Sequence, residues 1–128
     1  MSTRSLIAIE NLDGTCSSIY CHHDGYPDGV GYVLREFYNT PEAIAALQEL
    51  GDLSSLDETL ESCVAYHRDR GEDLNKATVW KNRSELVEHA SDAWVEYVYL
   101  FRSFKAWFVF SVYDKKWDLL SEVLAEES

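Results

Sequence analysis

Apolar and β-branched runs along the chain alternate with polar turns and with stretches of helical periodicity. The first two runs, Ser5–Glu10 and Cys16–Cys21, flank an Asp13-Gly14 dipeptide, and this arrangement predicts a β-hairpin. The two most apolar runs, Trp94–Phe101 and Ala106–Tyr113, are joined by the short connector RSFK. They predict a second pair of antiparallel strands, at the centre of a sheet.

Apolar residues at helical spacing predict helices between the two hairpins and at the end of the chain. Thr40 is the expected cap of one helix, with Pro41 at its first position and Gly51 just beyond its end. Another helix is predicted from Ser84 to about Ala93, and the segment WDLLSEVLAEE predicts a short final helix or a trailing segment. The helix before Thr40 has an apolar face made of Val30, Val33, Leu34, Phe37 and Tyr38.

The middle of the chain has weaker patterns. The segment DLSSLDETLES is typical of a loop, Cys63–His67 of a short strand, and Ala77–Trp80 of a strand that returns beside it. No repeat, low-complexity stretch or linker divides the sequence, so we expect residues 1–128 to form a single domain. The complete pattern predicts an α+β fold, in which helices pack on one face of a mostly antiparallel sheet.

Composition restricts the class of protein. The chain has 128 residues, of which 46% are hydrophobic and 13% aromatic, and these values exclude a disordered chain. The N-terminus lacks the apolar region of a signal peptide, and no apolar run is long enough to span a membrane. We therefore expect a cytoplasmic protein whose three cysteines, Cys16, Cys21 and Cys63, are free thiols.

Charge is the strongest global signal, because 23 acidic residues against 11 Lys and Arg give a net charge of -12. Between Glu36 and His67 there are seven carboxylates and no Lys or Arg. Such a surface repels nucleic acid and anionic membranes and attracts a basic groove, although acidity can also serve solubility alone. The expected partner-binding carboxylates are Glu42, Glu49, Asp52, Asp57, Glu58 and Glu61.

The segment CHHD (residues 21–24) contains side chains that can bind metals or transfer protons. Neighbouring residues in a strand point to opposite faces, so these side chains cannot all converge on one ion. The chain also lacks paired metal-ligand spacings and glycine-rich phosphate motifs. A structural corner is favoured instead, in which Asp24-Gly25 makes a turn and Asp28 caps a helix that begins near Gly29. We therefore predict no metal, cofactor or catalytic residue here.

Three segments resemble a family of small uncharacterised proteins from phages, prophages and some bacteria. They are SIYCHHDGYPDGVGYVLREFYNTPE, LGDLSSL and CVAYHRDRGED, and a similar EYVYLF segment lies near the C-terminus. The corresponding family segments read IYCHWDGYP…VG..L..HY, LGDLSSLG and AYHRDRGE. One departure is His23, which stands where the family usually has Trp. The resemblance implies a phage or mobile-element context and brings no established enzyme activity.

Together, charge and context predict a small non-enzymatic phage-type protein that acts by binding. We expect an anti-defence, anti-CRISPR-like inhibitor that mimics DNA and presents its acidic surface to the basic nucleic-acid-binding site of a host protein. His23 and Tyr26 would add an aromatic and titratable surface to the interface. Two alternatives remain open: a structural or assembly module of a phage particle, and a small enzyme with a site at Cys21, His22 and Asp24. The sequence does not fix the oligomeric state.

Overall fold

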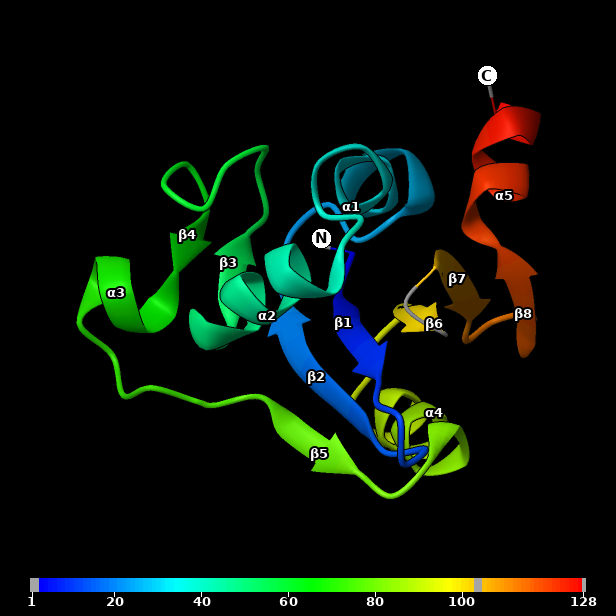
Figure 1. Ribbon diagram of the computed structural model, residues 1–128, viewed down its shortest axis with the longest axis horizontal. Helices are drawn as coiled ribbons and strands as arrows, with labels where there is room; N and C mark the ends of the chain where they lie inside the picture. Colours follow the sequence, from blue (N-terminus) through cyan, green and yellow to red (C-terminus); the bar gives the residue numbers. More distant parts are fainter. Residues whose placement is uncertain (1–2, 103–104, 128) are drawn as a thin grey trace.

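The computed structural model describes residues 3–102 and 105–127. Within these residues, eight strands form one mixed sheet in the order β4-β3-β2-β1-β6-β7-β8, with β5 also paired to β2 (Figure 1). The α+β class predicted from the sequence is confirmed, and most strand pairs are antiparallel. Two pairs are parallel, β1 with β6 and β2 with β3, and the sequence pattern did not predict them.

The two predicted hairpins form the centre of the sheet. β1 (Ser5–Glu10) pairs with β2 (Cys16–Cys21), and β6 (Tyr97–Arg102) pairs with β7 (Ala106–Ser111). β1 and β6 then lie side by side, which joins two hairpins that are far apart in the sequence. β8 (Lys116–Leu119) extends the second hairpin and includes the start of WDLLSEVLAEE, the segment that was expected to be a short helix or a trailing segment.

The outer edge of β2 is shared by two short strands. β3 (Leu53–Ser55) runs parallel to the end of β2, while β5 (Thr78–Trp80) runs antiparallel along its beginning. β4 (Val64–Ala65) pairs with β3 and not with β5, so the predicted pairing of the two short strands is wrong. The physical reason is that the Trp80 indole N–H donates to the Ser18 hydroxyl at 2.9 Å, which attaches β5 to β2.

Most helix positions agree with the prediction. The helix Tyr66–Arg70 was not predicted, because Cys63–His67 was expected to be a strand, and the caps also differ in part. The Thr40 hydroxyl accepts a hydrogen bond from the Ala43 N–H at 3.2 Å, as expected for a cap. Asn82, and not Ser84, caps the later helix, because its side chain accepts from the Glu85 N–H. The helical segments are η1 (Pro27–Gly31, a π-helix), α1 (Tyr32–Phe37), α2 (Pro41–Glu49), α3 (Tyr66–Arg70), α4 (Arg83–Asp92) and α5 (Leu120–Glu127).

Helices cover both faces of the sheet, which corrects the prediction of a single covered face. One core cluster includes Leu34 of α1, Leu47 of α2 and Leu120 of α5, whereas Leu86 and Ala90 of α4 belong to a second cluster. The reason lies in β1 and β6, where buried residues follow one another without polar alternation. Strands of this kind need an apolar partner on each side.

The buried core agrees with the sequence in its main residues. Val98, Val109 and Phe110 of the apolar second hairpin are 0%, 4% and 7% exposed. The three cysteines are buried and form no disulfide. Among the described residues, no helix has the length and apolarity that crossing a membrane requires.

Phe110→Ala is expected to lower the free energy of unfolding by about 3–5 kcal/mol, because it leaves a cavity beside Trp117, whose ring centroid lies 5.2 Å away. Urea denaturation would measure the change. Leu12→Ala is the control, since Leu12 is 91% exposed and its loss should change stability by less than about 0.5 kcal/mol. Equal effects of the two substitutions would contradict this assignment of the core.

Candidate functional site

The Asp24-Gly25 corner is held in place by three parts of the chain. The Gly25 N–H donates to the Thr3 carbonyl at 2.9 Å, and the Tyr99 hydroxyl donates to the Gly25 carbonyl at 2.6 Å. The Val30 N–H donates to the Asp24 carbonyl at 2.8 Å. A Cβ atom on Gly25 would lie 2.7 Å from the Thr3 oxygen, so only glycine fits without a shift of the backbone. These contacts support the structural interpretation of the corner.

The helix that follows the corner begins differently from the prediction. Its first segment is the π-helix η1, with Tyr26 at the N-cap and no side-chain cap, so Asp28 does not have the predicted role. The Tyr26 hydroxyl donates to Asp24 Oδ1 at 3.2 Å, and the Tyr26 ring lies against Gly29. Tyr26 and His23 are both exposed, so these two predicted partner-binding residues lie at the surface.

Cys21 and His22 lie on opposite faces of the sheet. Cys21 is completely buried, and burial raises the pKa of its thiol to about 12, so the thiol stays protonated at neutral pH. Asp24 lies in the turn, with a backbone φ of 56°. The structure therefore does not bring together the residues of the enzyme alternative. No group of three or more His, Cys, Asp or Glu side chains in the described part of the chain has an arrangement that could hold a metal ion.

His22 belongs to a second polar group, which we call the arginine–histidine face and define as Arg4, Tyr20, His22, Tyr66 and Arg70. The Tyr20 hydroxyl lies 2.7 Å from His22 Nδ1. The Arg70 guanidinium lies over the Tyr66 ring, 5.2 Å from its centroid, and donates to the Ser54 hydroxyl at 3.2 Å. The face therefore combines the end of β2 with α3 and with the residue before β1.

Two arginines belong to this face, although the chain is strongly acidic. Partial burial lowers the pKa of His22, and the charges of His23, Arg4 and Arg70 lower it further. Burial also raises the pKa of the Tyr20 phenol, so Tyr20 remains protonated and can donate to the neutral imidazole. In that arrangement, the His22 ring proton lies on Nε2 and is available to another acceptor.

Asp52 differs from the other predicted partner-binding carboxylates, because it has a structural role. Its Oδ1 accepts from the Tyr20 N–H at 3.0 Å, and its Oδ2 accepts from the Asn75 side chain at 3.2 Å. Asp52 thereby satisfies a backbone donor of β2 and ties the loop before β5 to β3. Its carboxylate is already committed to these internal contacts.

The other five predicted carboxylates are exposed, and none of the ion pairs among the described residues includes them. They lie on α2 and on the segment between β3 and β4. Both elements contribute to the same core cluster, through Leu47 in α2 and through Cys63 in the segment. The five residues are Glu42, Glu49, Asp57, Glu58 and Glu61.

One arginine from outside the base-free segment reaches the acidic region. The Arg68 guanidinium donates to the carbonyls of Leu60, at 2.8 Å, and Cys63, at 2.6 Å. It also pairs with Asp69 at 2.9 Å. The segment from Glu36 to His67 lacks a base in the sequence, but the fold supplies one near Glu61. Because Arg68 also pairs with Asp69, the two opposite charges largely offset each other at this place.

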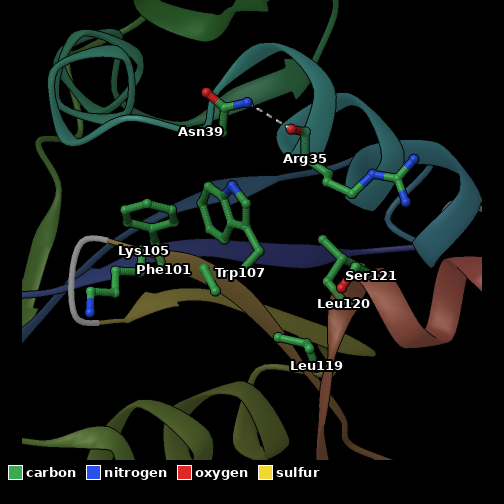
Figure 2. Close-up of a pocket in the computed structure, with 9 residues that line it drawn as sticks. Arg35, Asn39, Phe101, Lys105, Trp107, Leu119, Leu120 and Ser121 are labelled. Atoms are coloured by element: carbon green, nitrogen blue, oxygen red, sulfur yellow. Dashed lines mark hydrogen bonds between the residues drawn. The ribbon is translucent and has the colours of Figure 1, made fainter.

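A cavity of about 240 Å³ lies between α1, β7 and α5 (Figure 2). Its apolar wall includes Phe101, Trp107 and Leu120, and the Trp107 indole N–H donates to the Tyr38 carbonyl at 2.9 Å. Figure 2 shows the charged ends of Arg35 and Lys105 on opposite sides of Trp107. The two cations do not converge on one point, so they do not form a shared anion site in this cavity.

Comparisons of the chain with protein families, with curated proteins and with solved structures find no match. The candidate sites therefore depend on the geometry. Sequence reasoning missed the arginine–histidine face as a unit, although His22 and the segment YHRDR both lie in the quoted motifs. The signal was the recurrence of Tyr, His and Arg in two polar segments, and the fold was needed to bring them together.

Asp52→Ala is expected to lower the free energy of unfolding by about 1–3 kcal/mol, because the Tyr20 N–H loses its acceptor. Glu49→Ala removes an equal charge at an exposed position and should change stability by less than about 0.5 kcal/mol. Chemical denaturation of both variants would measure the difference. If Asp52→Ala leaves the free energy of unfolding unchanged, Asp52 has no structural role and belongs with the exposed carboxylates.

The His22 imidazole is expected to titrate below the value of about 6.5 that is usual for histidine. Because the unfolded chain binds this proton more readily, His22 contributes stability that is complete above the unfolded pKa and is lost as the pH falls towards the folded pKa. NMR titration of the ring, in the folded chain and in urea, would measure both values. Replacement of Arg4 and Arg70 by Gln should raise the folded value, and a folded pKa above the unfolded one would contradict this assignment.

Proposed function

We propose that this chain acts by binding and that its acidic surface occupies the basic nucleic-acid-binding site of a host protein. The observation that supports this function best is the group of five exposed carboxylates without ion pairs, on α2 and on the segment between β3 and β4. Lys and Arg side chains that normally bind phosphate groups can donate hydrogen bonds to carboxylates in the same way. The phage context implied by the sequence resemblance makes an anti-defence, anti-CRISPR-like inhibitor the concrete form of the proposal.

The carboxylates are presented by elements that are fixed to the core. Ile44 and Leu47 of α2 are fully buried. In the neighbouring segment, the Asp57 carbonyl accepts from the Tyr38 hydroxyl at 2.8 Å, and the Asp57 N–H lies 3.2 Å from the Cys63 sulfur. A rigid surface of this kind loses little conformational entropy when it binds a partner.

The expected contribution of each carboxylate is small. Water and salt screen exposed charges, so a single pair is typically worth about 0–1 kcal/mol. The summed field of several charges acts mainly on the rate at which two proteins meet. Substitution of one acidic residue should therefore have little effect, and only a combined variant can test the proposal.

Bacterial strains that each carry one defined defence system provide the test. Expression of the chain should restore phage plaquing in a strain whose defence depends on a nucleic-acid-binding protein. With that protein purified, the combined change of Glu42, Glu49, Glu58 and Glu61 to Gln should slow association by about tenfold and flatten its salt dependence. Asp52 stays unchanged, because its loss would disturb the fold.

A matched control removes the same number of charges from other exposed positions. These are Glu88 and Asp92 on α4, and Glu122 and Glu126 on α5. The control variant should associate almost normally. Equal slowing by both variants would mean that the acidity acts only as bulk charge, and restored plaquing in none of the strains would argue against the inhibitor function.

A further inference from the structure

The arginines of the chain fall into two groups. Arg35, Arg68, Arg83 and Arg102 each form an ion pair with a carboxylate. Arg4 and Arg70 form none with any residue that the structure describes, and both are exposed. This is unexpected in a chain with 23 acidic residues, where a carboxylate partner is easy to supply. The two unpaired arginines therefore need an explanation.

Both of these arginines lie close to the same histidine. Arg4 directly precedes Ser5, which pairs with Cys21, so Arg4 lies across from His22 at the end of β2. Arg70 donates to the Ser54 hydroxyl at 3.2 Å, and Ser54 directly follows Leu53, which pairs with Cys21 on the other side of β2. Asp52 acts on the adjacent Tyr20, but the Tyr20 N–H and the Asn75 amide already occupy its two oxygens. Asp52 therefore forms no ion pair with either arginine.

The surrounding fold leaves this face accessible. Tyr20 and His22 belong to the side of the sheet on which α4 packs, but α4 contacts β1, β5 and β6 and lies towards the other end of β2 (Figure 1). Tyr20, His22 and Tyr66 are partly exposed. Two guanidinium groups, a phenol and an imidazole are thus presented together at the end of β2.

We propose that the arginine–histidine face binds the phosphate group of a small phosphate monoester. Guanidinium groups bind phosphate oxygens through paired N–H donors, and the His22 Nε2–H supplies one more donor when Tyr20 donates to Nδ1. The two guanidinium groups, neither of which forms an ion pair with a described residue, favour an anion as the ligand. This site is separate from the acidic surface of the proposed function.

The ligand is a small ester and not a nucleic acid strand because of the charge around the site. A long polyanion would extend from this face over a surface whose net charge is -12, and repulsion would oppose it. A single phosphate dianion experiences mainly the local field of the two arginines, because salt screens more distant charges beyond about 8–10 Å. The face therefore favours one phosphate over a chain of them.

NMR titration with inorganic phosphate and with AMP tests the site, at slightly alkaline pH and at a constant ionic strength maintained with potassium chloride. Saturable shifts of the His22 ring and of the Arg4 and Arg70 Nε–H signals are expected. The double variant Arg4→Gln, Arg70→Gln should weaken binding of both probes by about tenfold or more. The variant Lys76→Gln, Lys81→Gln removes the same charge from exposed positions and should bind both probes normally.

Several results would overturn the proposal. Shifts that do not saturate, or that persist in the arginine double variant while its melting temperature is unchanged, would show that phosphate does not bind at this face. Tighter binding of a thymidine oligonucleotide than of AMP, with strong salt dependence, would replace the monoester by a nucleic acid strand. If the lysine variant weakens binding of the probes equally, the effect comes from the net charge of the protein and not from this face.

Discussion

The parallel pairing of β1 with β6 is the interaction on which the rest of the structure depends. It joins two hairpins that are each local in sequence, and it creates a central pair of strands that is buried on both faces. Because both faces must be covered, α4 packs on one side and α1, α2 and α5 on the other. The corner after β2 depends on the same pairing, since Tyr99 of β6 reaches Gly25 across β1. The pairing of β1 with β6 therefore holds in place the elements that carry the candidate surfaces.

The sequence pattern predicted those features of the fold that depend on neighbouring residues in the chain. Both hairpins follow from runs with short connectors, and the cap at Thr40 follows from the residues beside it. The parallel pairing was not predictable in the same way, because it depends on residues about ninety positions apart. One signal was nevertheless present: Leu6, Ile7, Ala8 and Ile9 are apolar at successive positions, which is typical of a strand that is covered on both sides.

The roles of individual residues on the candidate surfaces were also not predictable from local sequence. Composition indicated an acidic region, but it could not distinguish Asp52, which binds backbone and side-chain donors, from Glu49, which is exposed to solvent. Composition also could not show that Arg68 from α3 donates hydrogen bonds to carbonyl groups of the acidic segment. Arg4 and Arg70 are separated by most of the first half of the chain, and only the sheet brings both of them to His22. Side-chain roles of this kind depend on tertiary contacts.

The ends of the sheet have a consequence for how other chains can associate with this one. β4, β5 and β8, which have an unshared side, contain 2, 3 and 4 residues. Strands this short offer few unpaired backbone groups to a neighbouring chain, and β8 also carries the charged pair Lys116 and Asp118. Extension of the sheet by a strand from another molecule, the first step of many aggregates, is therefore disfavoured. A partner of this protein would therefore contact mainly its side chains, and substitutions at the surface would change that contact without a change in the sheet.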